Sequence, residues 1–369
     1  MRLAWVTLAV VGSFTTQRFC VVLGTHRMQY ELPQAQDSTI WDIWLSMHNL
    51  PAMAVADEIG VLQALEKEPA TSAEVAQRLG LNRRATEVLF SMLRALDLVV
   101  LREGRHELAD VSRTYLLPQS PYYWGPLLRA IGVLPQQRAA LIRALNATNE
   151  FDAGMPGRLP SHAWASGEMD RAQAEAVSRA MHCHSLSASV GAARNGNFGD
   201  VKRLLDVGGG SGCFSIAIAQ HFPDIRCTIM ELRSVCEVAQ GYIERGGVRE
   251  RVNTIAVDMF HDPWPRDYDG ILLSNVLHDW NTEVDLFLAR RAYEALPSGG
   301  RIFLHEMLLA EDGAGPLTTA SFSMLMLFTT QGRQYSLSEL RQILSDAGFV
   351  AIDVRPTHGY YSVVSGRKP

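Results

Sequence analysis

Hydrophobic positions recur at helical spacing in the first third of the chain. After residue 40, apolar side chains are spaced three or four residues apart at Val55, Ile59, Leu62 and Leu65. This spacing is typical of short helices that bury one face. Thr71 or Ser72 can cap a helix over 73–79, and another helix is predicted over 84–96.

A strand, a turn and a second strand are predicted next, over 98–101 and 106–108. Helices followed by a hairpin are the pattern of a winged helix, which often binds DNA. The helix that would read the bases has mixed charge, with Arg83, Arg84 and Arg94 against Glu87 and Asp97. We therefore favour packing against a second copy, and a part in roofing a pocket, over DNA contact.

From residue 201 onward, short apolar runs alternate with helical segments. The runs lie at 203–207, 227–230, 252–257, 271–275, 301–304, 351–354 and 360–364. This alternation predicts an α/β fold with a doubly wound, mainly parallel sheet.

The same patterns predict how the chain divides into domains. A winged-helix domain is expected over 28–120, a helical connector over 121–200 that includes a helix over 170–190, and the α/β domain over 201–369. Residues 1–27 contain a short apolar run after Arg2 that cannot span a bilayer. We expect them to be a dispensable extension or an upstream misassigned start, with Met28 the working first residue; a signal peptide is the lesser alternative.

Composition narrows the classes of function. The 369 residues are 47% hydrophobic and 20% charged, with a net charge of −5. The sequence has no long run of like charges of the kind that binds nucleic acid. The five cysteines form no C-x-x-C pair, which argues against a disulfide framework or a zinc site. A cytoplasmic location fits best.

The strongest local motif is an apolar strand that runs into glycines. Residues 204–212 read LLDVGGGSG, so that glycines stand at 208, 210 and 212. Such a turn lets a ligand lie against bare backbone. The third glycine of a dinucleotide fingerprint would fall at position 213, which is Cys213. A nicotinamide cofactor is therefore not favoured.

Acidic residues end the first three strands of this region. Asp206 belongs to the first, Glu231 directly follows the second and lies 25 residues after Asp206, and Asp258 with Met259 ends the third. A carboxylate at the second position can accept both ribose hydroxyls of an adenosine. Each acid alone could be a cap or a solvated loop residue, but the three in register favour a nucleoside pocket.

These motifs resemble those of the small-molecule O-methyltransferases of the caffeic acid and acetylserotonin type. The most specific segments are 206–212 (DVGGGSG), 258–260 (DMF), 276–280 (VLHDW) and 345–349 (SDAGF). The resemblance implies a Rossmann-like class I methyltransferase domain with a seven-strand sheet whose last strand is antiparallel. It also implies S-adenosylmethionine as cofactor, a hydroxyl of a small, aromatic acceptor as target, and a homodimer through the N-terminal domain.

The resemblance further implies which residues catalyse the reaction. His278 would be the general base that removes the hydroxyl proton, a role worth roughly 10²- to 10⁴-fold in rate. Glu306 would orient its imidazole. Many relatives have a second orienting glutamate where this chain has Gln334, which can hydrogen-bond but carries no charge.

The resemblance also implies roles for the strand-end residues above and for further positions. Cofactor contacts are implied for Asp206, Gly208, Gly210, Glu231, Asp258, Met259, Ser185 and Ser274, and an acceptor pocket for Met181, Met324, Met326 and Phe328. His182 and His184 point apart on a helix, so we expect no metal. Three alternatives remain open: C- or N-methylation of a similar molecule, a winged-helix regulator that senses the cofactor, and a catalytically idle dimer partner.

Overall fold

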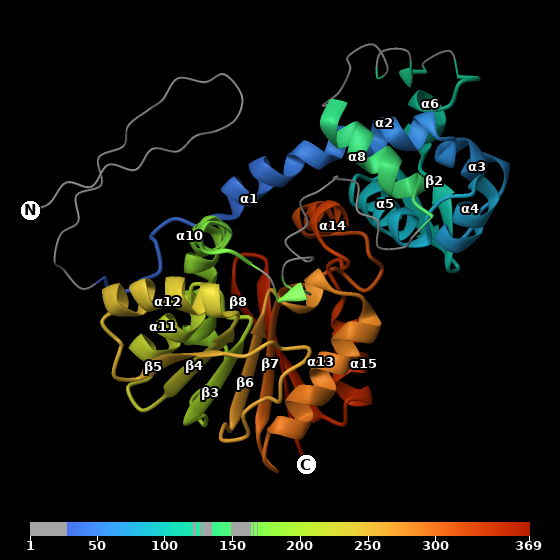
Figure 1. Ribbon diagram of the computed structural model, residues 1–369. Coiled ribbons are helices and arrows are strands. Elements are labelled where there is room, and N and C mark those ends of the chain that lie inside the picture. Colours follow the sequence, from blue (N-terminus) through green and yellow to red (C-terminus); the bar gives the residue numbers. More distant parts are fainter. Residues whose placement is uncertain are drawn as a thin grey trace, which may run out of the picture.

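The N-terminal part of the protein is helical and ends in a small hairpin (Figure 1). The computed structural model describes residues 28–120, 123–125, 128, 135–148, 164, 166–167 and 169–369, so the predicted extension over 1–27 lies outside it. The elements are α1 (Ser38–Leu45), η1 (Ser46–His48), α2 (Asn49–Glu58), α3 (Val61–Lys67), α4 (Ser72–Leu79), α5 (Arg83–Ala95), β1 (Val99–Arg102), β2 (Arg105–Leu108), α6 (Asp110–Tyr115) and α8 (Pro135–Asn146).

Local signals in the sequence set the ends of these helices. The Thr71 side chain accepts the Glu74 N–H while Glu74 accepts the Thr71 N–H, so the predicted cap of α4 is a complete capping box. The apolar period from Val55 to Leu65 crosses a break between two helices, because Gly60 adopts a left-handed conformation with φ of +84°. The predicted order of helices and hairpin is confirmed, with this break added.

A seven-stranded sheet forms the C-terminal part, in the order β5-β4-β3-β6-β7-β9-β8. The strands are β3 (Arg203–Val207), β4 (Arg226–Glu231), β5 (Val252–Ala256), β6 (Gly270–Ser274), β7 (Arg301–Met307), β8 (Val350–His358) and β9 (Tyr361–Arg367). Strands β3 to β7 are parallel and β9 runs antiparallel to both neighbours. The predicted mostly parallel sheet with an antiparallel last strand is confirmed.

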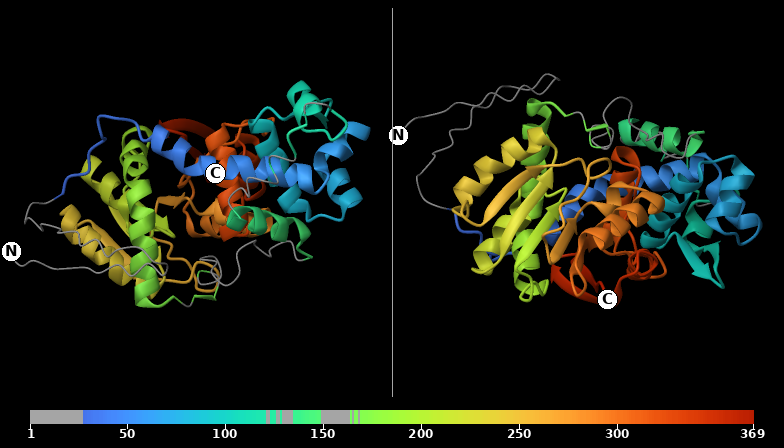
Figure 2. Two further views of the ribbon diagram at one scale, coloured as in Figure 1. Left: turned by 90° about the horizontal axis from the view of Figure 1, so that it is seen from above. Right: turned by 60° about the horizontal axis from the view of Figure 1, so that its bottom comes forward.

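Helices cover both faces of the sheet (Figures 1 and 2). One face carries α10 (Arg171–Asn195), α11 (Cys213–His221) and α12 (Arg233–Gly246), and the other carries α13 (Thr282–Ala295) and α15 (Leu337–Asp346). Neighbouring residues of a strand face opposite sides of the sheet. Leu204 of β3 therefore packs in the core under α10, α11 and α12, and Leu205 packs in the core under α13 and α15. Burial on both faces explains why these strands read as continuous apolar runs.

One helix of the C-terminal part packs into the N-terminal core. The buried side chains of α14 (Leu317–Thr329) include Met324 and Phe328, which belong to the same core as Leu89 and Leu93 of α5. Arg84 of α5 is buried and donates to the carbonyls of Gly332 and Thr330, at 2.7 and 3.1 Å. Arg94 is also buried. Two of the three arginines of α5 are thus turned into the protein and do not form a basic outer stripe.

Candidate active site

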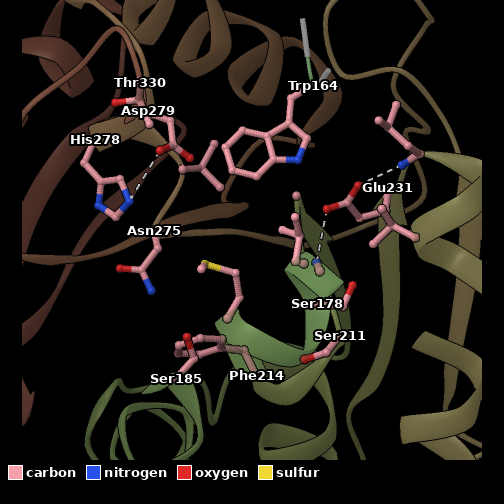
Figure 3. A pocket seen from close by; sticks show the side chains of 18 of the residues that line it. Trp164, Ser178, Ser185, Ser211, Phe214, Glu231, Asn275, His278, Asp279 and Thr330 are labelled. Carbon is pink, nitrogen blue, oxygen red and sulfur yellow. Dashed lines mark hydrogen bonds and ion pairs between the residues drawn. The ribbon is translucent and has the colours of Figure 1, made fainter. Parts of the chain in front are cut away.

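A cavity of about 360 Å³ opens where β3, β4, β5 and β6 end. Because parallel strands bring their carboxyl ends to one edge, the loops that follow them meet there. The glycine loop lines this cavity, and α10 and α14 contribute further side chains to it; Ser185 of α10 lies beside Ser211 and Phe214 (Figure 3). Most of the lining is apolar, with polar groups supplied chiefly by Ser178, His184, Ser185, Ser211, Glu231, Asp258, Asn275, His278, Asp279 and Thr330.

The glycine loop exposes backbone to this cavity. Gly208, Gly210 and Gly212 have φ of +65°, +55° and +76°, a region that other residues rarely adopt. No atom lies within 4 Å of the place where a Cβ on Gly210 would stand, so the space in front of it is open. The loop therefore offers a flat backbone surface on which a ligand can lie.

Glu231 reaches this surface from the end of β4. Its carboxylate accepts the Gly210 N–H at 3.2 Å and the Leu232 N–H at 2.8 Å. Burial raises the pKa of Glu231 to about 7, although these two hydrogen bonds act in the opposite direction. A carboxylate has about four acceptor positions, so room remains for hydroxyls of a ligand.

Asp206 lies beneath the glycine loop and does not line the cavity. It is fully buried, and Ser215 donates to its carboxylate at 2.7 Å. Burial raises its pKa to about 6. A Cβ on Gly209 would stand 2.7 Å from the Asp206 carboxyl carbon, so the acid and the loop are in close contact. The structure thus places Asp206 as a support for the loop.

Asp258 and Met259, which follow β5, also line the cavity. The Asp258 carboxylate accepts the Phe260 N–H at 2.8 Å and lies 2.8 Å from Nδ1 of His261. Burial by itself would raise the pKa of Asp258, but these hydrogen bonds outweigh it and lower the pKa. Asp258 therefore presents a charged acceptor beside an apolar side chain.

His278 is held by a buried carboxylate. It lies in η2 (Leu277–Asp279), and its Nδ1 is 2.7 Å from Oε2 of Glu306 in β7. The other oxygen of Glu306 accepts the N–H groups of Val276 and Leu277, each at 3.2 Å. His278 and Glu306 are 4% and 1% exposed. A carboxylate at Nδ1 keeps the proton of a neutral imidazole there, so the lone pair is on Nε2.

Two acids set the charge of this imidazole. Burial lowers the pKa of His278, but the carboxyls of Glu306 and Asp279 outweigh it and raise the pKa to about 9. Asp279 Oδ1 is 3.8 Å from Nε2 of His278, and both side chains line the cavity (Figure 3). Burial raises the pKa of Asp279 to about 7. Asp279 was not predicted as a site residue, although it directly follows His278 in the sequence.

Ser274 and Gln334, like Asp206, do not line the cavity. Ser274 Oγ is instead 3.0 Å from Nδ1 of His305 in β7. Gln334 is fully buried, its N–H donates to Ser323 Oγ at 3.1 Å, and its side-chain amide has no hydrogen-bond partner among the described residues. The contacts of His278 are therefore with Glu306 and Asp279 rather than with Gln334.

The side chains predicted to form the acceptor wall lie on different faces of α14. Met326 lines the cavity, whereas Met324 and Phe328 are packed in the N-terminal core. Residues two apart lie on nearly opposite sides of a helix, so the three side chains cannot share one face. Prediction from helical spacing would have found Phe322 and Leu325, which do line the cavity.

Helix α10 brings further side chains to the cavity. Met181, His184 and Ser185, spaced three and four residues apart, share the face that lines it. His182 points elsewhere, with Nδ1 2.8 Å from the hydroxyl of Ser211. Within the part of the chain that the structure describes, no three His, Cys, Asp or Glu side chains are grouped closely enough to hold a metal ion.

Comparison with known proteins finds one family along most of the chain. The profile of the O-methyltransferase domain matches residues 146–350. A 3-hydroxy-5-methyl-1-naphthoate 3-O-methyltransferase of Streptomyces sahachiroi is 32% identical over 310 residues, which cover 83% of this chain and 88% of that relative.

Solved structures of methyltransferases are also similar to this chain. An O-methyltransferase family 2 protein from Planctomyces limnophilus DSM 3776, in complex with apigenin, has a TM-score of 0.82 and 28% identity, covering 92% of this chain and 98% of that one. Human N-acetylserotonin methyltransferase in complex with SAM has a TM-score of 0.54 and 25% identity, covering 92% and 99%.

The hydrogen bond between Glu306 and His278 leads to a prediction about titration. Glu306→Gln removes the negative charge that favours the imidazolium, so the pKa of His278 should fall by at least about 1 from its value near 9. Titration followed by NMR of the histidine rings measures it. Glu311→Gln, at an exposed carboxylate bound to Ser338, is the control, and an unchanged pKa in Glu306→Gln would contradict the assignment.

Proposed function

The chain belongs to the O-methyltransferase family, and from that premise we propose that this S-adenosylmethionine-dependent enzyme methylates a hydroxyl of a small, aromatic natural product, with His278 as general base. The observation that carries the proposal is the position of His278. Glu306 is hydrogen-bonded to Nδ1 of His278, and the His278 side chain lines the same cavity as the glycine loop. A base is thus placed where the carboxyl ends of the strands assemble the ligand site.

The residues of the cavity fit the cofactor. Open backbone at Gly210 suits close approach of a ligand, Glu231 can accept ribose hydroxyls, and Asp258 with Met259 suits an adenine ring. Ser185 on α10 can donate to a carboxylate. The bound cofactor supplies a methyl group on a positively charged sulfur. Asp206 supports the loop from below, and Ser274 has no part in this assignment.

His278 carries out the proton transfer in this proposal. The neutral form of His278, which a pKa of about 9 makes the minor form at neutral pH, accepts the proton of the acceptor hydroxyl at Nε2 as the oxygen becomes a nucleophile. Glu306 keeps the ring in the required tautomer and stabilises the imidazolium that forms. Asp279, 3.8 Å from Nε2, adds a further negative charge beside the ring when it is ionised, which its pKa of about 7 allows at and above neutral pH. The protonated base is thus stabilised by two carboxyls at the moment it appears.

The shape of the cavity supports an aromatic acceptor. Trp44, Trp164 and Phe322 contribute flat side chains, and Met181 and Met326 contribute adaptable ones. Such walls suit a planar ring. Two relatives point the same way, since one is named for a hydroxynaphthoate and another was solved with apigenin.

The N-terminal part supports assembly with a second copy. Ile40 and Ile43 of α1 are 68% and 66% exposed, and Leu50 of α2 is also exposed. Exposed apolar side chains on one helix suit an interface, so we propose a homodimer with domains at 28–120, 121–200 and 201–369. The burial of Arg84 and Arg94 disfavours the DNA-binding alternative.

The location of the protein is part of the proposal. Among the described residues, no helix is both long and apolar enough to cross a bilayer. Cys213, Cys227 and Cys236 are buried free thiols. Free cysteines suit a reducing compartment, so we propose the cytoplasm.

Cofactor binding is tested at the glycine loop. Gly210→Val should reduce S-adenosylhomocysteine binding below detection in calorimetry, because the side chain fills the open space and disfavours φ of +55°. Gly104→Val is the matched control, since Gly104 also has a positive φ (+74°) and open surroundings but lies in the β1–β2 turn. Equal binding by Gly210→Val and wild type would refute the site.

Catalysis is tested at His278. Acceptors are found by screening phenols, hydroxyindoles, quinones and polyketide aglycones with labelled cofactor, and mass spectrometry of the product separates O- from C- or N-methylation. His278→Ala should then retain S-adenosylhomocysteine affinity while kcat falls on the order of 10² or more. His221→Ala, at an exposed position of α11, is the control. Undiminished kcat in His278→Ala would remove it from the base role.

A further inference from the structure

Asn275 lies at the edge of the sheet, next to the general base. It follows β6 directly and precedes His278 by three residues, and both side chains line the cavity (Figure 3). Its backbone N–H donates to the carbonyl of His305 at 3.0 Å, which fixes this point of the chain to β7. The side chain is therefore held on a rigid element beside the reacting position.

The backbone of Asn275 is unusual. Its φ of +54° lies in the left-handed region, which costs energy for residues other than glycine although asparagine tolerates it better than most. Among the described residues, Asp97, Glu103, Asn197 and Ala351 also have positive φ, and none of them lines the cavity. Strain of this kind collects at functional sites.

The amide of Asn275 is only partly satisfied within the protein, because its one side-chain hydrogen bond is to the buried hydroxyl of Tyr361. Its Oδ1 is buried and has no hydrogen-bond partner among the described residues. Buried polar atoms are almost always hydrogen-bonded. The nearby wall from α14 is made of Phe322, Leu325, Met326 and Thr329, and the Thr329 hydroxyl already donates to the Leu325 carbonyl at 2.8 Å. A bound molecule can supply the missing partner.

We propose that Asn275 is a specificity-determining residue: its amide hydrogen-bonds a second oxygen substituent of the acceptor, close to the hydroxyl that reacts at His278. The enzyme then favours aromatic rings with two neighbouring oxygens, such as a dihydroxy or hydroxy-carboxy arrangement, over rings with one hydroxyl. An amide both donates and accepts, so it can hold either kind. This inference rests on the proposed function and adds the substrate class.

Matched probes separate recognition from a purely structural role. Initial rates are measured with 2-naphthol, 2,3-dihydroxynaphthalene and 3-hydroxy-2-naphthoate at saturating cofactor. Wild type should have kcat/KM at least about 10-fold higher for the better two-oxygen probe than for 2-naphthol, because a site built for a hydrogen bond rejects the analogue that lacks it. Asn275→Gly, which relieves the backbone strain but removes the amide, should lose most of this ratio.

Two further variants complete the test. Asn197→Gly has the same left-handed backbone, with φ of +62°, away from the cavity and should keep the wild-type ratio. Asn275→Asp keeps the size of the side chain but lacks the amide donor, so it should change which two-oxygen probe is preferred. This variant replaces Asn275→Gly in the test if Asn275→Gly does not fold.

Each contrary outcome has a distinct meaning. Retention of the wild-type ratio in the folded Asn275 variants would assign Asn275 to the turn alone and overturn the inference. Wild type that binds S-adenosylhomocysteine but methylates no probe, or shows no preference between them, would overturn the acceptor class while leaving the cofactor site intact. Wild type that binds no S-adenosylhomocysteine would instead refute the proposed function.

Discussion

The buried hydrogen bond between Nδ1 of His278 and Glu306, 2.7 Å long, is the contact on which the proposed chemistry depends. Glu306 belongs to β7 and His278 to the turn after β6, so the bond joins two neighbouring parallel strands at their carboxyl ends. It fixes the ring, sets its tautomer and opposes the effect of burial on its pKa. Without the carboxylate, an imidazole that is 4% exposed would resist protonation and serve poorly as a base.

The same sheet edge positions the other half of the reaction. Glu231 ends β4, the glycine loop follows β3, and Asn275 follows β6, so all face one cavity without long connections. Helices α10 and α14 cover this edge, and α14 also packs against α5. The acceptor side of the cavity is therefore built on a helix that the N-terminal part holds in place. A change in that packing would alter the acceptor wall before it altered the cofactor side.

Much of this could be predicted from the sequence, for reasons that are local. Strand patterns, the capping box at Thr71 and the glycine loop are all encoded within short segments. The differences between the predicted and the observed positions concern side-chain direction. Met324 and Phe328 lie away from the cavity because α14 is a helix, and Asp206 and Ser274 are turned to partners, Ser215 and His305, that only the fold brings near. The role of Asn275 depends on its backbone angle, which no periodicity reveals.

The most direct measurement is the pKa of His278 by NMR titration with each form of the cofactor bound. S-adenosylmethionine carries a positive sulfur and S-adenosylhomocysteine does not, while the rest of the two molecules is nearly the same. If the sulfur faces the imidazole, the positive charge disfavours the imidazolium, and the pKa of His278 should be lower by about 1 or more with S-adenosylmethionine. The same pKa in both complexes would contradict the placement of the base beside the methyl group.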